Sequence, residues 1–218
     1  MHRPMSTIYD LYLGGVRAGE LSIDARFAGG RYSATSVLRT AGVVGALFKA
    51  SFEAESEGRL GAEGLEPERF RADSRTYSDE QAVEMTYAGR RPAAVRAQPA
   101  FVPKPWQIEP TAQTGTLDPV SAALTALAPA PPRAICNRSV EIYDGRRRYA
   151  VDLGRPEADG ERIKCPALYR RVAGYKAKEL KETIAFDLWF EERADGLAHV
   201  VRAAGEAGLG LAVALLRE

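Results

Sequence analysis

Apolar and polar residues alternate along much of the chain, and a period of two is typical of half-buried β-strands rather than of helices. In the segment 16–27, Leu21 and Ile23 share one face while Ser22 and Asp24 share the other. The same alternation recurs in segments 47–57, 69–77, 83–87 and 184–190. The pattern therefore predicts an antiparallel sheet with one apolar face.

Short glycine motifs connect these segments. Gly14-Gly15 and Gly29-Gly30 bound the first long strand, and Asp144-Gly145 separates the segments 138–143 and 146–153. Dipeptides of this kind favour tight β-hairpin turns, so strands that follow one another along the chain should pair. In the last predicted strand, 208–216, two further glycines predict a bend or bulge.

The alternation stops in a proline-rich stretch that contains the best helix signal of the chain. The segment from Pro92 to Pro132 contains nine prolines, these two included, and proline cannot donate a hydrogen bond to a sheet. Within this stretch Asp118 is a good N-cap, followed by Pro119 at the first helical position. Apolar residues at helical spacing then predict a short amphipathic helix over about residues 118–128.

These elements predict a mainly β fold: a strongly curved antiparallel sheet or incomplete β-barrel, with the short helix packed on or plugging its concave face. At 218 residues the chain fits one domain, residues 1–218. We expect a first antiparallel strand set over 8–98, a proline-rich connection with the helix over 99–132, and a second strand set over 133–218.

Composition excludes several classes of partner. The formal net charge is +1, which argues against nucleic acid or an anionic membrane surface as the main partner. No apolar run reaches the roughly 18 residues that a spanning helix needs, so the protein is not expected to span a membrane. Residues 1–7 lack the apolar core of a secretory signal, which leaves a cytoplasmic location open.

Catalytic and cofactor motifs are weak. The two histidines, His2 and His199, are far apart in sequence, and a zinc site needs three or four ligands at suitable spacing. No G-x-S-x-G motif marks a nucleophile, and no G-x-G-x-x-G motif precedes a helix. We therefore expect no cofactor, no metal and no enzymatic activity, with a hydrolase of envelope polymers as a remote alternative.

The candidate binding residues are instead the apolar side chains of the predicted concave face. They are Leu21, Ile23, Phe27, Phe48, Phe52, Phe186, Leu188 and Phe190. They line either a ligand cavity or a filled core. Arg147 and Tyr149 lie on one face of the strand that follows the Asp144-Gly145 turn. This arginine is either part of an exposed hairpin tip or an anchor for an anionic headgroup or a partner carboxylate.

Cys136 and Cys165 are the two cysteines of the chain. Their separation does not fit a C-x-x-C redox or zinc motif. They form either a disulfide, which would require an oxidising compartment, or two unrelated buried thiols.

Several ordered motifs resemble a bacterial family of exported proteins called domain of unknown function 3108 (DUF3108). The resemblance extends from about Ile8 to about Phe190. It rests on five segments: 9–19 (YDLYLGGVRAG), 56–58 (SEG), 64–67 (GLEP), 118–121 (DPVS) and 143–149 (YDGRRRY), together with the two cysteines and 173–175 (AGY).

The resemblance implies a periplasmic location and a disulfide between the two cysteines, because members usually carry a signal peptide. It also implies a fold of the lipoprotein-carrier type. It supplies no catalytic residues. On this basis we expect a non-enzymatic periplasmic protein that binds an apolar or lipid-like ligand, or a lipidated partner, in the cavity of a curved sheet. The alternative is an interaction module that holds an envelope protein and binds no small ligand.

Overall fold

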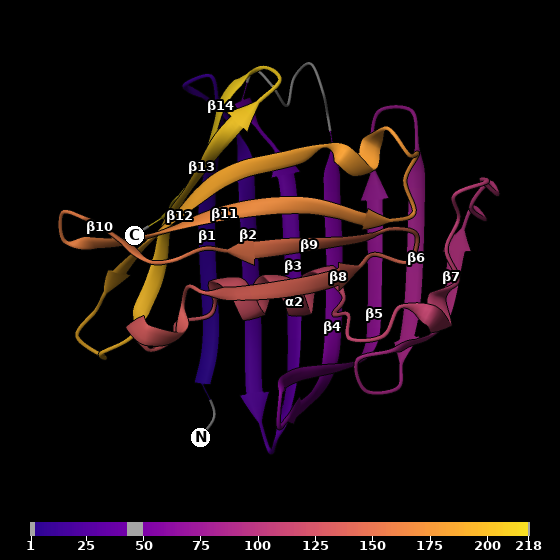
Figure 1. Cartoon of the computed structure of the whole chain (residues 1–218), viewed down its shortest axis with the longest axis horizontal. Coiled ribbons are helices and arrows are strands. Elements are labelled where there is room, and N and C mark those ends of the chain that lie inside the picture. Colours follow the sequence, from indigo (N-terminus) through magenta and orange to yellow (C-terminus); the bar gives the residue numbers. More distant parts are fainter. Residues whose placement is uncertain (1–2, 43–49, 218) are drawn as a thin grey trace.

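The computed structural model describes residues 3–42 and 50–217, and its strands confirm the predicted antiparallel β architecture (Figure 1). The helical segments are η1 (Pro110–Ala112), α2 (Pro119–Leu127), η2 (Pro132–Ala134) and η3 (Glu179–Lys181). The strands are β1 (Arg3–Leu13), β2 (Val16–Ala28), β3 (Arg31–Thr40), β4 (Ser51–Gly61), β5 (Gly64–Arg75), β6 (Glu80–Tyr87), β7 (Pro92–Gln98), β8 (Arg138–Tyr143), β9 (Arg148–Leu153), β10 (Glu157–Asp159), β11 (Arg162–Ala173), β12 (Thr183–Glu192), β13 (Ala198–Ala207) and β14 (Gly210–Leu216).

All of these strands belong to one sheet whose order is β7-β6-β5-β4-β3-β2-β1-β14-β13-β12-β11-β9-β8, with β10 paired to β11. The path ends at β7 and at β8, which do not pair with each other, so the sheet is not closed. The last strand, β14, pairs with the first, β1, and this pairing joins the two predicted strand sets into a single sheet.

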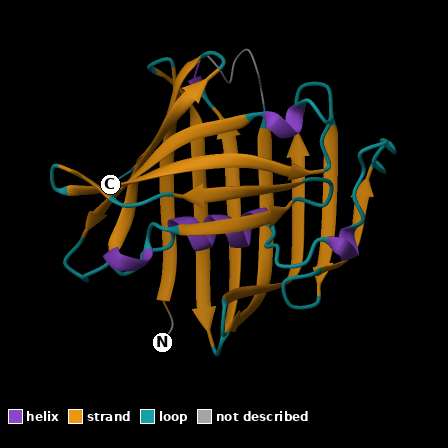
Figure 2. Ribbon diagram, viewed as in Figure 1, coloured by secondary structure: helices purple, strands orange, loops and turns teal. Residues whose placement is uncertain are grey.

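The sheet folds over on itself through β13 and β14. Figures 1 and 2 show that β8, β9, β11 and β12 run across the front of β1–β6. α2 contacts β8 on one side and β3, β4 and β5 on the other, so it lies between the two layers. The curved sheet with a helix on its inner face is therefore confirmed.

α2 begins where the sequence predicts it. The Asp118 carboxylate accepts hydrogen bonds from the backbone N–H groups of Val120 and Ser121, which would otherwise lack partners at the start of a helix. Val120 and Leu124 are 2% and 1% exposed and pack against the first layer. Because nine residues make an isolated helix marginal in water, this packing is what stabilises it.

The alternation of the strands determines which side chains enter the core. Phe70 and Ala72 of β5 are buried, while Arg69 and Arg71 between and beside them are exposed, as the period of two predicts. One core cluster centres on β2–β6 and α2, and a second centres on β1, β11, β12 and β13. Leu21 and Leu127 pack against both clusters and so connect the layers.

Two predicted boundaries are corrected. β1 starts at Arg3 rather than near residue 8, and it pairs with β2 over its whole length. β7 lies within the first strand set, and its Pro92 is tolerated because it is the first residue of an edge strand. Gly208 lies in the turn between β13 and β14, so the last strand begins at Gly210 rather than bulging.

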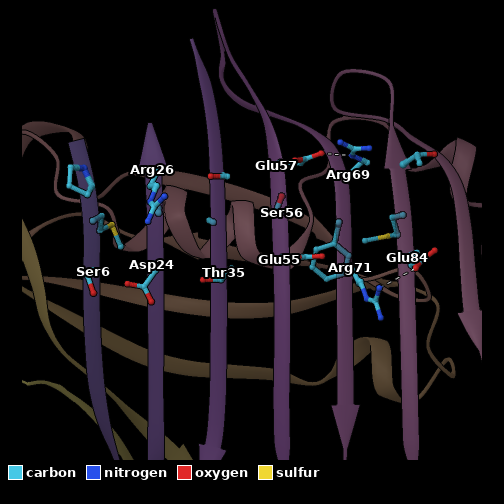
Figure 3. Close-up of a pocket in the computed structure, with 18 residues that line it drawn as sticks. Ser6, Asp24, Arg26, Thr35, Glu55, Ser56, Glu57, Arg69, Arg71 and Glu84 are labelled. Atoms are coloured by element: carbon cyan, nitrogen blue, oxygen red, sulfur yellow. Dashed lines mark hydrogen bonds and ion pairs between the residues drawn. The ribbon is translucent and has the colours of Figure 1, made fainter. Parts of the chain in front are cut away.

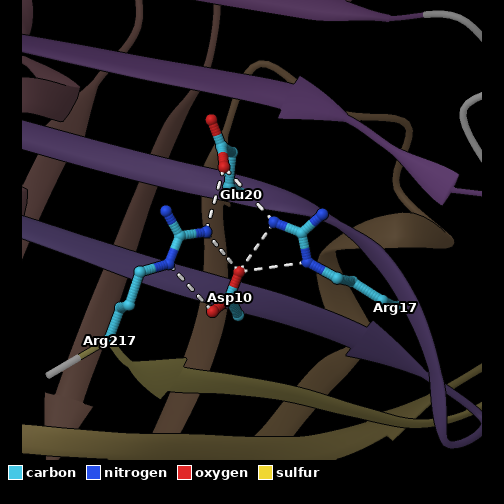
Figure 4. Close-up of polar contacts among 4 residues, drawn as sticks. All are labelled: Asp10, Arg17, Glu20 and Arg217. Carbon is cyan, nitrogen blue, oxygen red and sulfur yellow. Dashed lines mark hydrogen bonds and ion pairs between the residues drawn. The ribbon is translucent and has the colours of Figure 1, made fainter.

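The C-terminal end of the described chain is tied to the β1–β2 hairpin on the outer face of the sheet. Arg217 and Arg17 both donate hydrogen bonds to Asp10, and both also pair with Glu20 (Figure 4). The paired carboxylates and guanidiniums alternate, so each charge faces one of opposite sign. This network and the β1–β14 pairing hold the C-terminal strand against the N-terminal hairpin.

A disulfide joins Cys136, in the loop before β8, to Cys165 of β11, with their Cα atoms 5.6 Å apart. Both sulfurs belong to the second core cluster. Of the two alternatives left open by the spacing, the structure therefore has the disulfide, which is consistent with an oxidising compartment. Within residues 3–42 and 50–217, no helix has the length and apolar character to cross a membrane.

Candidate functional site

The predicted lining residues lie on the inner face of the sheet, but at two different depths. Ile23, Leu188 and Phe190 are between 0% and 4% exposed and belong to the packed core. The others are half-buried and pack at the edge of the core clusters: Leu21, Phe27, Phe52 and Phe186. Phe48 lies outside the described residues.

Some inner-face apolar side chains remain accessible at the end of the sheet away from α2. Leu21, Leu38 and Phe52 are cross-strand neighbours on β2, β3 and β4. Leu38 is 37% exposed although it follows the same inward alternation as buried Tyr32 and Ala34. On β12, Ile184 follows the inward alternation of Leu188 and is 47% exposed. We call Leu21, Leu38, Phe52, Ile184 and Phe186 the inner-face rim.

The sequence alone did not single out Leu38 and Ile184. Ile184 continues the alternation of Phe186, and Leu38 is the cross-strand neighbour of Leu21. The period of two assigns a side chain to a face but not to a depth, so it cannot separate a rim residue from a core residue. That difference depends on how the second layer covers the first.

Cationic side chains from the segments 146–147 and 171–176 lie over three aromatic rings, one of which belongs to the buried Tyr175. The guanidinium carbons of Arg147 and Arg171 lie 5.0 and 5.3 Å from the ring centroid of Tyr175. Lys176 Nζ lies 5.4 Å from the ring of Trp106. The guanidinium of Arg146 lies 5.4 Å from the ring of Phe101. We call Arg146, Arg147, Arg171, Tyr175 and Lys176 the basic cluster.

A glycine allows the two halves of the basic cluster to approach each other. Gly174 has φ +86°, and a Cβ on it would lie 2.7 Å from the carbonyl oxygen of Arg146 and 3.0 Å from Arg147 Cα. Any other residue would therefore clash with the turn that precedes β9. The sequence pointed to the arginines on both sides, but not to this contact between segments that are about thirty residues apart.

Two further tyrosines connect the basic cluster to the rim. The rings of Tyr149 and Tyr169 have centroids 5.2 Å apart, and the hydroxyls of Tyr169 and Tyr175 are 2.8 Å apart. Tyr169 is the cross-strand neighbour of Ile184. Burial raises the pKa of Tyr149 and of Tyr175, so both remain neutral hydrogen-bonding groups. Arg147 and Tyr149 were both predicted as binding residues. Tyr149 thus lies on the inner face of the sheet, and Arg147 lies at the edge of that face.

A buried polar network fixes α2 to the first layer. The second carboxylate oxygen of Asp118 accepts hydrogen bonds from Ser56 Oγ at 2.8 Å and Ser121 Oγ at 2.6 Å. Tyr32 OH lies 2.6 Å from Ser121 Oγ. Burial raises the pKa of Asp118, and its hydrogen bonds lower it part of the way back. Burial also raises the pKa of Tyr32 to about 12. Both carboxylate oxygens of Asp118 accept hydrogen bonds within this network, so the network supports the helix.

The outer face of β1–β6 is hollowed into a polar trough of about 820 Å³ (Figure 3). Its floor follows one cross-strand row of the sheet: Ser6, Asp24, Thr35, Glu55, Arg71 and Glu84. Arg71 pairs with Asp73 and Glu84, and Arg69 pairs with Glu57. Asp24 and Glu55 form no ion pair with any described residue. The period of two places these side chains on the polar face of the sheet but does not show that this face is hollowed.

Within the described residues, no group of three or more His, Cys, Asp or Glu side chains is arranged to hold a metal ion. His199 Nε2 lies 3.3 Å from Asp195 of the same hairpin, at the surface of β13.

A protein-family model described as "Protein of unknown function (DUF3108)" matches residues 8–212, nearly the whole chain. The chain belongs to the DUF3108 family. The match includes the strands of both layers, α2, both cysteines and the basic cluster, so the resemblance found in the motifs is confirmed over a longer range.

The fold of the DUF3108 chain is similar to that of a solved structure. It is similar to the crystal structure of a β-barrel-like protein of domain of unknown function DUF1849 from Brucella abortus, with a TM-score of 0.53 and 13% identity. The alignment covers 99% of this chain and 96% of that chain. At this identity the likeness shows the fold alone. Comparison with curated proteins gives no significant match.

Proposed function

We propose that the protein is a non-enzymatic binding protein of the bacterial periplasm whose ligand is an apolar or lipid-like molecule. The observation that carries the proposal is the exposure of inner-face apolar side chains at the rim, 37% for Leu38 and 47% for Ile184. Side chains of this type are stabilised by removal from water, by about 1.5–3 kcal/mol each when fully buried. A ligand that covers the rim supplies that burial.

The ligand contacts in this proposal differ from the full set predicted from the sequence. Ile23, Leu188 and Phe190 support the site from within the core, and the rim makes the contact. α2 occupies the opposite end of the inner face, where Ser121 meets Tyr32. The ligand therefore enters at the ends of β2–β4 beside β12.

The test is the binding of N-phenyl-1-naphthylamine, an uncharged apolar probe whose fluorescence rises in apolar surroundings. We expect Ile184→Asp and Leu38→Asp each to weaken its binding by about tenfold, because a charged group desolvated by the ligand costs more than 1.4 kcal/mol. Leu209→Asp is the matched control, since Leu209 is 79% exposed in the turn between β13 and β14. Equal effects of the rim and control variants would contradict the proposal.

The polar trough favours a second candidate, an interaction module for another envelope protein. Its volume of about 820 Å³ and its mixed charges suit a polar protein segment better than an apolar ligand. A photo-crosslinking residue at Thr35, on the trough floor, should then give one discrete protein adduct in the periplasm. The same residue at Arg155, an exposed loop position after β9, is the control. Identical adducts at both positions would count against the module.

A further inference from the structure

Three side chains of the basic cluster carry charges that no described carboxylate neutralises within 4 Å: Arg146, Arg147 and Lys176. Arg171 differs from them, because it forms an ion pair with Glu182 and donates to the Glu179 carbonyl oxygen at 3.2 Å. Other arginines of the same layer are paired as well, Arg148 with Glu141 and Arg170 with Asp152. The cluster therefore contains three cations that form no ion pair with a described carboxylate, beside one that does.

The acidic groups next to the cluster are engaged with backbone groups. Asp144 Oδ1 accepts hydrogen bonds from the N–H groups of Arg146 and Arg147, at 2.9 and 2.7 Å. Glu179 Oε2 accepts one from the N–H of Lys176 at 2.8 Å. These carboxylates shape the two turns that carry the cations, and the side-chain N–H groups of the cations remain available.

The aromatic rings hold the cations in place without using their hydrogen-bond donors. A guanidinium that stacks on a ring presents its face to the ring and its N–H edge to the surroundings. Arg147 is exposed and rests on Tyr175, and Lys176 is exposed and rests on Trp106. Several donors from two turns therefore face one region of the surface.

We propose that the basic cluster binds the phosphate group of an anionic amphiphile whose apolar part lies along the inner-face rim. This inference rests on the proposed apolar ligand and names its charged end. The two regions are continuous, because Tyr169 is the cross-strand neighbour of Ile184 and hydrogen-bonds to Tyr175. A phosphate fits the cluster better than a carboxylate does, since its three oxygens and higher charge can engage two guanidiniums and an ammonium together.

The test compares two probes with the same twelve-carbon chain, dodecyl phosphate and the uncharged dodecyl maltoside, by isothermal titration calorimetry below their micelle concentrations. We expect Arg147→Gln and Lys176→Gln each to weaken dodecyl phosphate binding by about tenfold, the loss of one charge-assisted contact, and to leave dodecyl maltoside binding unchanged. Arg147→Lys, which keeps the charge but loses the planar stack, should lie between. Arg155→Gln is the control for a general change in charge.

Other binding results would overturn either the phosphate site or the apolar ligand. If the two probes bind equally well to the wild type and to every variant, the apolar ligand stands and the phosphate site is overturned. If neither probe binds, the proposed function itself fails, and titration with inorganic phosphate then separates the two sources of the anion. Phosphate binding that Arg147→Gln abolishes would identify a free-phosphate site and overturn the amphiphile.

Discussion

Asp118 shows how one residue can have both a local and a long-range role. Its position before Pro119 marks a helix start in the sequence, and the structure confirms the cap. The sequence could not show that the same carboxylate also binds Ser56, which lies 62 positions earlier on β4. Local capping depends on neighbours along the chain, whereas this contact depends on how α2 is seated between the layers.

We expect Asp118→Ala to lower the free energy of unfolding by about 3 kcal/mol, because it removes the cap and leaves the hydroxyls of Ser56 and Ser121 without their acceptor. Asp118→Asn keeps one acceptor oxygen and should cost less. Urea denaturation measures both. Asp24→Ala, on the exposed outer face, is the control and should change the free energy by less than about 0.5 kcal/mol.

The pKa of Asp10 is lowered, whereas that of Asp118 is raised. Hydrogen bonds from Arg217 and then Arg17 hold the pKa of Asp10 well below its usual value of 3.8. Below pH 3.8 the unfolded chain binds the proton more readily than the folded protein, so stability is lost as the pH falls.

The stabilising contribution of Asp10 should therefore be present above pH 3.8 and fade below it. The difference in urea midpoint between wild type and Asp10→Asn should shrink as the pH is lowered through this range. It should also shrink with added salt, because the network is at the surface. A difference that stays constant with pH would show that the network does not stabilise the fold through its charge.

At the level of the element, hairpins and α2 are predictable because their signals are short and local. β7 has no such signal of its own, because it begins with a proline, a residue that strands tolerate mainly at an edge. β4 illustrates a constraint that alternation does not reveal. Gly58 is buried there, and a Cβ on it would lie 2.8 Å from both Pro67 Cα and Tyr32 Cε1.

Gly58→Ala should therefore destabilise the protein by about 1–3 kcal/mol through overpacking between β3, β4 and β5. Gly208→Ala is the matched control, because nothing lies within 4 Å of a Cβ at that position and its φ is not positive. Thermal unfolding followed by circular dichroism measures both. A loss at Gly208 as large as that at Gly58 would point to a general cost of replacing glycine rather than to packing.

The disulfide is the other constraint between elements, and the sequence could not decide it because two cysteines fit either state. We expect Cys136→Ser to lower stability by about 3–4 kcal/mol under oxidising conditions, the chain entropy of a loop closed over 29 residues. In reductant, the variant and the wild type should unfold at similar temperatures. An equal loss in reductant would mean that the sulfur atoms matter for packing and not as a cross-link.

At the level of the whole molecule, the pairing of the first strand with the last could not be predicted from local patterns. A period of two assigns faces, and turn motifs pair strands that are adjacent in sequence, but β1 and β14 are separated by nearly the whole chain. This pairing turns two predicted strand sets into one sheet, and Leu21 and Leu127 contact both core clusters. The layers should therefore not be stable apart.

We accordingly expect one cooperative unfolding transition in urea. Both tryptophans, Trp106 and Trp189, lie after the β1–β7 layer in the chain, so their fluorescence reports on the second half, while far-UV circular dichroism reports on the whole sheet. Coincident midpoints from the two probes would be the signature of a single domain over 1–218. If fluorescence changed at a lower urea concentration than circular dichroism, the β8–β13 layer would be unfolding while β1–β7 remained, and the β1–β14 pairing would have to be weaker than the contacts within each layer.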